Sequence, residues 1–360
     1  MNKAEYKDLI AFHPGYYIKD IIAEMDITQS EFAKRLGTTD KTLSKLLSAQ
    51  IPLSKDIAQK LSQMLGTTIE LWLKLQLAYD EKVIEIEQRK SIDEEKEYLK
   101  LIDYNYFVDL KLVKETQKPE ERIFNLRKFL QISSLSVLKE KDFLVACRSV
   151  LRNVTEKNII NANAWVQTAL NSAKNLECDP YNKKLLISYL PQIRKMTLQK
   201  PEIFYPRLGE IFRECGVAFV RLPHLPSSGV HGAVKWINES KVLLAINNGN
   251  QYADTFWFSL LHEIKHILQQ KIKSIFISGD KDYKGDSILE SEADLFARNY
   301  LISEKEYQAF IEKGSFDITS IKNFAQQIDL HPDIVIGRLQ IDKYLESDSF
   351  EHERITYFIK

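Results

Sequence analysis

The sequence predicts a mainly α-helical protein with a small β-sheet. Two short helical segments separated by one glycine lie within residues 27–47, and a charged, glycine-poor stretch covers 81–200. Three short apolar runs over 216–246 are typical of strands. With 360 residues the chain exceeds the usual size of one compact core. We therefore expect an all-α N-terminal domain over 1–80, a helical interaction region, and an α+β C-terminal domain over 201–360.

Composition limits the possible partners and compartments. Fifty Lys and Arg residues balance fifty Asp and Glu residues, so any affinity for nucleic acid must come from local patches. Cys147, Cys178 and Cys215 match no metal or redox spacing, which is typical of a reducing cytosol. The N-terminus lacks the apolar segment of a signal peptide, and no run approaches the length of a membrane span. We expect a soluble cytoplasmic protein that does not contact a membrane.

The segment ITQSEFAKRLGTTDKTLSKLL (27–47) predicts a helix-turn-helix. Thr28 and Glu31 have the spacing of a capping box, and Gly37 is a helix stop. Thr39 is then placed to cap a second helix. The apolar positions of the two helices recur at helical spacing and comprise Phe32, Ala33, Leu36, Leu43, Leu46 and Leu47. The alternative is a plain helical hairpin with a solvated, charged face.

A helix-turn-helix inserts the start of its second helix into the major groove. The candidate DNA-binding residues are Gln29, Thr39, Lys41, Thr42, Ser44 and Lys45. Among them Lys41 and Thr42 are best placed for base edges, and Gln29 suits a phosphate contact. Residues 28–60 carry six basic and three acidic side chains, a modest local excess of positive charge.

Residues 13–80 resemble the DNA-binding domain of HigA-type antitoxins of the Xre/Cro-like class. The resemblance rests on the opening His13-Pro14-Gly15, the TxxxAxxLG core and the closing WLKLQLAYD. It implies a five-helix fold, a homodimer on a palindromic double-stranded DNA operator, repression of the protein's own operon, and a cognate toxin partner. Asp40 departs from the family pattern at the start of the second helix, where it either caps the helix or repels phosphate.

The segment FSLLHEIKHILQQ (258–270) carries His-Glu-x-x-His on a helix expected to begin at Asp254 as N-cap. His262 and His266 are four residues apart, so both imidazoles project from one side and suit two corners of a zinc tetrahedron. Glu263 could polarise a metal-bound water without being a ligand. The alternative is two surface histidines on an amphipathic helix.

A third metal ligand is expected in the helix SILESEADLFARNYL (287–301). The E-x-x-x-D spacing lets Glu290 bind metal while Asp294 accepts a hydrogen bond from a ligand imidazole. Glu292 competes as the ligand but points to a different helical face, and we favour Glu290. Alternatively, Glu290 completes a capping box with Ser287.

These two helices, over 254–268 and 290–302, together resemble the ImmA/IrrE family of zinc metallopeptidase-like domains. The resemblance extends over about residues 200–345. It implies that His262, His266 and Glu290 bind Zn²⁺ and that Glu263 is the general base for attack on a peptide carbonyl. His231 and His331 are candidates for stabilising the oxyanion, with a structural role as the favoured alternative for each.

Two hypotheses combine these modules. In the first, the chain is an antitoxin and repressor whose zinc domain binds a toxin or is structural. In the second, it is a zinc endopeptidase that cleaves a regulator or itself and is localised on DNA by its helix-turn-helix. Residues 81–200 carry no chemical motif and are expected to serve packing, dimerisation or partner docking.

Overall fold

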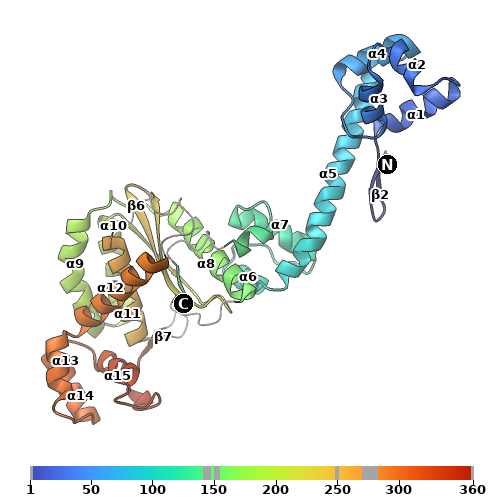
Figure 1. Ribbon diagram of the computed structural model, residues 1–360. Coiled ribbons are helices and arrows are strands. Elements are labelled where there is room, and N and C mark those ends of the chain that lie inside the picture. The colour runs from blue at the N-terminus through green and yellow to red at the C-terminus, as the bar shows by residue number, and fades with distance from the viewer. Residues whose placement is uncertain (1–2, 141–146, 150–154, 248–250, 270–282, 358–360) are drawn as a thin grey trace. The chain divides into compact units, whose positions relative to one another are not determined.

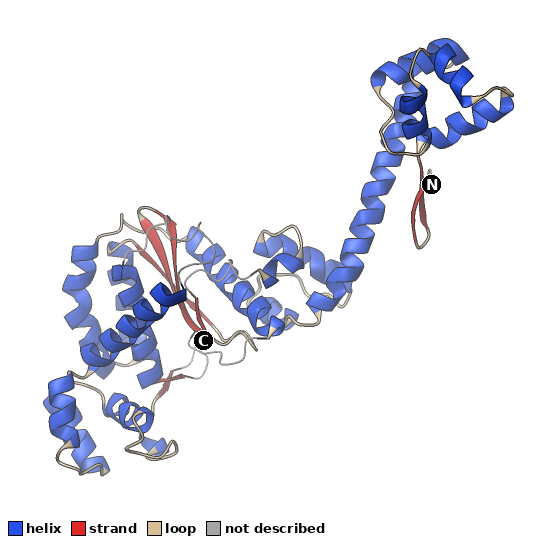
Figure 2. Cartoon of the chain, in the orientation of Figure 1, coloured by secondary structure: helices blue, strands red, loops and turns tan. Residues whose placement is uncertain are grey.

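The computed structural model describes residues 3–140, 147–149, 155–247, 251–269 and 283–357 (Figure 1). Helices dominate this part of the chain, and the strands form small sheets (Figure 2). The chain divides into two compact units. The first comprises Met1–Tyr98 with Lys118–Ile123, and the second comprises Leu99–Gln117 with Phe124–Lys360.

The N-terminal unit contains the predicted helix-turn-helix within a bundle of five helices. These are α1 (Pro14–Glu24), α2 (Gln29–Leu36), α3 (Asp40–Leu47), α4 (Lys55–Leu65) and α5 (Ile69–Leu99). Their inward apolar residues form one core that includes Ile18, Phe32, Leu43, Leu61 and Trp72. The five helices agree with the number that the resemblance implied.

The expectation of an all-α N-terminal domain is wrong, because this domain also contains two strands. Strands β1 (Lys3–Tyr6) and β2 (Leu9–Phe12) form an antiparallel hairpin in which Tyr6 pairs with Leu9. The two-residue turn is possible because Lys7 adopts a left-handed conformation, with φ 54°. The Tyr6 hydroxyl donates a hydrogen bond to Asp93 of α5 at 2.9 Å, which fixes the hairpin to that helix.

The residues that carry the antitoxin resemblance have structural roles in this unit. His13 caps α1, with its Nδ1 accepting the Gly15 amide at 3.0 Å, and its ring lies edge-on to Tyr79 at 4.8 Å. The amide of Gln76 is buried on α5. Its Oε1 accepts the Leu53 amide at 2.8 Å, so α5 satisfies the backbone of the loop before α4.

The second unit is built on a four-stranded sheet of order β3-β5-β6-β4. The strands are β3 (Cys147–Ser149), β4 (Val217–Leu222), β5 (Val230–Asn238) and β6 (Lys241–Asn247). Strands β4 and β6 are parallel, and β5 runs antiparallel to β6 and β3. The three strands predicted over 216–246 are thus confirmed.

Helices cover this sheet, and β6 is therefore buried along nearly its whole length. Val242, Leu244 and Ile246 belong to the same core as residues of α10 and α11, and α8 also contacts β6. Along the chain, α6 (Tyr104–Asp109), α7 (Pro119–Leu130) and a 3₁₀ turn, η1 (Leu135–Lys139), precede β3. Helices α8 (Glu156–Lys174), α9 (Lys183–Lys195) and α10 (Pro201–Glu214) lie between β3 and β4 in the sequence.

After the sheet the chain continues with β7 (Gln251–Tyr252), α11 (Ala253–Gln269), α12 (Tyr283–Leu301), α13 (Glu304–Ile311), α14 (Ile318–Gln327), α15 (Pro332–Ile341) and β8 (Thr356–Tyr357). Helix α11 carries His-Glu-x-x-His and packs against both β5 and α12. Strand β8 pairs with β7 directly before α11, so the C-terminal segment returns to the start of that helix.

Candidate nucleic-acid interface and candidate metal centre

The two helices of the predicted helix-turn-helix begin and end as their sequence indicated. Thr28 Oγ1 accepts the Glu31 amide at 3.2 Å, and Thr39 Oγ1 accepts the Thr42 amide at 3.1 Å. Gly37 ends α2 at φ 67°. Only half of the expected capping box is formed, because the Glu31 carboxylate binds Arg35. The six apolar positions predicted to face inward are all buried.

Helix α3 presents most of the candidate DNA-binding residues to solvent. Lys41, Ser44 and Lys45 are exposed, and so is Gln29 at the first position of α2. The Thr42 side chain is half-buried, with its hydroxyl oxygen 2.9 Å from Thr39 Oγ1. The Thr39 oxygen therefore serves primarily as the helix cap.

Asp40 is not the cap of α3, because Thr39 occupies that position. Instead, the Ser30 hydroxyl donates to the Asp40 carboxylate at 3.0 Å, a hydrogen bond that crosses the turn from α2 to α3. The Lys60 ammonium of α4 donates to the Gly37 carbonyl at 3.1 Å. The turn is therefore held by polar contacts from both sides.

On the second unit, α11 and α12 bring His262, His266 and Glu290 together. The two Nε2 atoms lie 2.9 Å apart. One Glu290 oxygen is 3.2 Å from His266 Nε2, and the other is 3.4 Å from His262 Nε2. His262 is almost fully buried, with 1% of its side chain exposed, whereas Glu290 is 39% exposed. The cluster therefore opens to solvent on the Glu290 side.

Two other acidic residues of α12, Asp294 and Glu292, occupy distinct positions. Asp294 Oδ1 lies 3.1 Å from His262 Nδ1, where it can accept a hydrogen bond from that nitrogen and orient the ring. Glu292 faces away from the imidazoles and accepts from Gln269 at 3.2 Å. Helix α12 begins at Tyr283, so Ser287 is not its N-cap and the capping-box alternative for Glu290 does not apply.

Charges in the cluster stabilise one another. Burial alone would raise the pKa of Glu290, but hydrogen bonds from His262 and His266 bring that pKa well below its usual range. Burial would lower the pKa of His266, but the Glu290 hydrogen bond and the Glu263 charge raise it overall. Glu290 is therefore a carboxylate at neutral pH, the form that binds metal.

Glu263 is 2% exposed and packs against strand β5. A Cβ placed on Gly232 would lie 2.7 Å from atoms of the Glu263 side chain, so any larger residue there would require that side chain to shift. Glu263, His262 and His231 together line one wall of a cavity of about 460 Å³. His331 caps α15 through its Nδ1, which accepts the Asp333 amide at 3.2 Å, and so has a structural role. The contact between Gly232 and Glu263 could not be predicted from the sequence, because a glycine within a strand can occur for several structural reasons.

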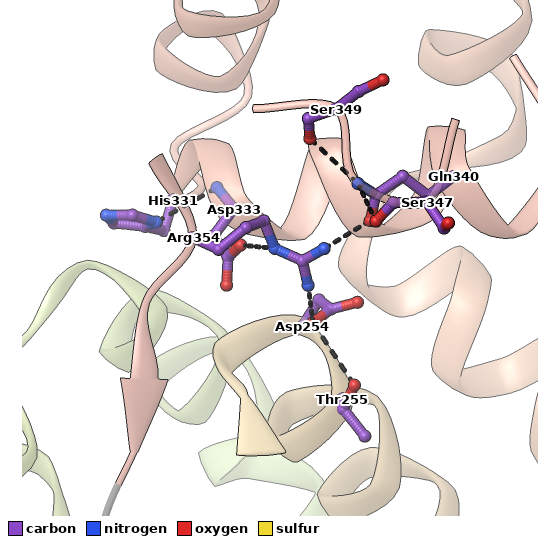
Figure 3. A network of polar contacts seen from close by, with 8 residues as sticks. All are labelled: Asp254, Thr255, His331, Asp333, Gln340, Ser347, Ser349 and Arg354. Carbon is purple, nitrogen blue, oxygen red and sulfur yellow. Dashed lines mark hydrogen bonds and ion pairs between the residues drawn. The ribbon is translucent and has the colours of Figure 1, made fainter. Parts of the chain in front are cut away.

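A buried ionic network holds the start of α11 (Figure 3). Asp254 is in the first turn of α11 rather than at the predicted N-cap, and its carboxylate binds Arg354. Arg354 also binds Asp333 and Gln340 of α15. The Trp257 indole donates to the Tyr357 hydroxyl at 3.1 Å. The C-terminal segment therefore fixes α11 to α15 next to the histidine cluster.

Burial raises the pKa of Asp333 to about 6, despite the opposing charge of Arg354. It also raises the pKa of Asp254, again against the effect of Arg354. Two buried carboxylates thus share one guanidinium, an arrangement whose stability depends on that cation.

No helix in the described part of the chain is long and apolar enough to cross a membrane.

Comparisons with known proteins concern the N-terminal unit. Residues 18–72 match the family model described as helix-turn-helix. YddM, an uncharacterized HTH-type transcriptional regulator of Escherichia coli, is 30% identical over 83 residues, which cover 22% of this chain and 88% of YddM.

Two solved structures are similar to the same part of the chain. One, from Nostoc punctiforme, is described as an antidote protein of a plasmid maintenance system; it is 31% identical, with 23% of this chain and 92% of that chain covered and a TM-score of 0.23. The other, from Coxiella burnetii, is described as an addiction module antidote protein of a HigA family; it is 30% identical, with coverages of 24% and 94% and a TM-score of 0.22. The family model and the match over most of YddM show that the chain belongs to the helix-turn-helix family of transcriptional regulators.

Proposed function

We propose that this chain is an antitoxin-type repressor that binds its own operator as a homodimer and carries a zinc site in its C-terminal domain. The observation that carries the DNA-binding proposal is the exposed, capped helix α3, with Lys41 and Lys45 on one face. The resemblance of residues 13–80 to HigA-type antitoxins supports the palindromic operator and a toxin partner. A protein dimer would match the symmetry of such an operator.

Lys41 and Lys45 are the residues that we expect to contact DNA most strongly. Arg35 binds Glu31, and Lys60 binds Asp56 at 2.8 Å, so both of these charges are already compensated. Lys41 and Lys45 form no ion pair with any described residue. Both lysines lie in the first two turns of α3, and the start of a recognition helix is the part that enters the major groove.

The test is DNA binding by the full chain, measured by fluorescence anisotropy on the DNA upstream of its own reading frame. We expect Lys41→Ala to weaken binding about 10-fold or more and to reduce the salt dependence by about one counterion. Lys74→Ala is the matched control, since Lys74 is 72% exposed but lies on α5. Equal affinity and an equal salt slope for Lys41→Ala would disprove docking through α3.

Toxin neutralisation is tested separately from DNA binding. We expect the product of a small reading frame adjacent to this gene to arrest growth and to co-purify with the full chain. Growth arrest that co-expression of the full chain does not relieve would contradict the antitoxin assignment and leave a repressor.

The three side chains of the metal cluster fit Zn²⁺. A tetrahedral zinc with bonds of about 2.0–2.1 Å places its ligand atoms about 3.3 Å from one another. The corresponding separations here are 2.9, 3.2 and 3.4 Å. Two imidazole nitrogens and a carboxylate are a common zinc donor set, and Asp294 is placed to orient His262.

A second function, zinc-dependent peptide hydrolysis, is favoured by the position of Glu263. Bound zinc would supply a Lewis acid for the peptide carbonyl. The Glu263 carboxylate lines the same cavity as His262 without belonging to the cluster of possible ligands. There it could take a proton from the attacking water and return it to the departing amide nitrogen.

Elemental mass spectrometry of purified protein tests the zinc site. We expect about one zinc per chain, lost in His262→Ala and in Glu290→Ala. Glu292→Gln is the matched control and should keep its zinc, because Glu292 bonds Gln269 instead. Full zinc occupancy in His262→Ala would refute the ligand assignment.

Peptide hydrolysis is tested with the zinc-loaded chain and a mixture of quenched-fluorescent peptides. Glu263→Gln should retain zinc and lose hydrolysis, by about 100-fold or more for removal of a general base. Wild-type and Glu263→Gln proteins that both lack hydrolysis would leave zinc with a structural role.

A further inference from the structure

We infer that Asp40 sets the base preference of the proposed operator contact, by accepting a hydrogen bond from the amino group of a cytosine in the major groove. The inference rests on the proposed DNA binding through α3 and adds the base that this helix selects. Asp40 is the first residue of α3, and the first residues of a recognition helix are the ones that contact base edges.

The Asp40 carboxylate is exposed and oriented by the turn between α2 and α3. The Ser30 hydroxyl donates to its Oδ2 at 3.0 Å. Thr39 caps α3, so Asp40 is not needed as the cap. Its Oδ1 accepts no hydrogen bond, and the carboxylate forms no ion pair, within the part of the chain that the structure describes. One oriented acceptor oxygen is therefore available to a partner outside the chain.

The chemistry of the major groove decides which base can donate to such an oxygen. Guanine presents two acceptors there, and thymine presents an acceptor and a methyl group, so neither can donate to a carboxylate. Adenine and cytosine each present an amino group, but the adenine amino group lies beside the N7 acceptor. Cytosine N4 has no acceptor next to it on the same base. A carboxylate therefore prefers cytosine.

The lysines of α3 explain why a carboxylate is tolerated at this surface. Lys41 and Lys45 are exposed, and the attraction of their two ammonium groups to phosphates outweighs the repulsion of the single Asp40 carboxylate. The carboxylate still opposes every base pair that does not offer it a donor. Asp40 should therefore weaken binding to DNA in general and increase the discrimination between sequences.

A purely structural role for Asp40 is the alternative. An acidic residue in the first turn stabilises a helix through the helix dipole, and the hydrogen bond from Ser30 could serve only the turn. The two roles have different consequences for DNA. Loss of a structural residue disturbs α3 and weakens the preference at all operator positions together. Loss of a base-contacting residue changes one base pair in each half-site.

Selection of binding sites from a library of random DNA duplexes by the full chain, followed by sequencing, tests the inference. We expect the wild type to select an inverted repeat that has a cytosine in each half-site, and Asp40→Ala to lose the preference at that position alone. Asp40→Asn should select adenine there, because an asparagine amide bonds adenine N6 and N7 together. The asparagine oxygen can still accept from Ser30, so this variant preserves the turn.

Affinities measured by fluorescence anisotropy give the size of the effect. The wild type should bind the selected duplex about 10-fold more tightly than a duplex with guanine in place of that cytosine. Asp40→Ala should bind these two duplexes equally, and should bind a duplex of unrelated sequence about 3-fold more tightly than the wild type does, because one repulsive charge is gone. Glu70→Ala is the matched control: it removes a 71% exposed acid on α5 and should select the wild-type sequence.

The outcomes separate this inference from the proposed repressor function. Selection of the wild-type sequence by both Asp40 variants, with binding still weakened by Lys41→Ala, would overturn the inference and leave docking through α3 in place. A preference lost at all positions together would assign Asp40 a structural role and also overturn it. So would a base other than cytosine at the position that changes. A wild-type chain that selects no sequence would overturn the repressor function and the inference with it.

Discussion

Replacement of Arg354 by methionine should destabilise the C-terminal unit and not the N-terminal one. Arg354 has 5% of its side chain exposed and binds two carboxylates, Asp254 with 11% and Asp333 with 0% exposed. Methionine keeps much of the volume and removes the charge. Both acids then remain buried without their cation, at the point where α11 begins and α15 packs against it.

The magnitude follows from the burial of the network. Removing one partner of a buried ion pair costs about 3–5 kcal/mol. Part of this cost depends on pH, because Asp333 ionises in the wild type with a pKa of about 6. In the variant Asp333 must stay protonated in the folded state, while it ionises in the unfolded chain. The difference in free energy of unfolding between the wild type and Arg354→Met therefore increases by about 1.4 kcal/mol for each pH unit above 6.

Hydrogen exchange measured by mass spectrometry on the full chain is the appropriate assay, because it reports on each unit separately. Amides of α11 and α15 should lose protection by about 3–5 kcal/mol at pH 7, and those of α1–α4 should keep theirs. Lys322→Met is the matched control: it breaks an exposed pair with Glu353, 2.7 Å apart, and should cost less than about 1 kcal/mol. A loss below about 1 kcal/mol for Arg354→Met, or a gap that narrows with rising pH, would refute the reasoning.

Two further predictions concern the N-terminal unit and the metal site. Burial lowers the pKa of His13, whose unprotonated Nδ1 caps α1, so stability present above pH 6.5 should be lost as the pH falls toward the folded pKa; exchange of α1 amides between pH 5 and pH 7 should show this loss, and His13→Asn, which keeps a capping acceptor, should flatten it. Gly232→Ala places a methyl group 2.7 Å from the Glu263 side chain, so this variant should displace Glu263 and abolish the proposed hydrolysis while elemental analysis still finds the proposed zinc. Hydrolysis at the wild-type rate in Gly232→Ala would contradict the packing of Glu263 on β5.

Local signals account for what could be predicted from the sequence. The caps at Thr28 and Thr39 and the i, i+4 spacing of His262 and His266 each depend on residues within one or two helical turns. Helical phase also separates Glu290 from Glu292, which is why one faces the imidazoles and the other faces Gln269. Contacts within one or two helical turns do not depend on how the rest of the chain folds.

Long-range contacts account for what could not. Aspartate is a residue type favoured at the N-cap, so Asp254 was assigned there. Its partner Arg354 lies 100 residues further along the chain, and no local pattern connects the two. The N-terminal hairpin was missed for a related reason. Its strands are only four residues each, and contacts such as that of Tyr6 with Asp93, 87 residues away, hold it to α5.

The space left by Gly232 also gives a way to sort related chains by their chemistry. A chain with the two histidines and the glutamate of the possible metal cluster, but with alanine or valine at the position of Gly232, would keep the proposed ligands and displace the proposed general base. Such a chain would hold metal as a structural element, whereas one with glycine there could use it in catalysis. A single strand residue, outside both signature helices, would then distinguish a working enzyme from a scaffold that has kept only its shape.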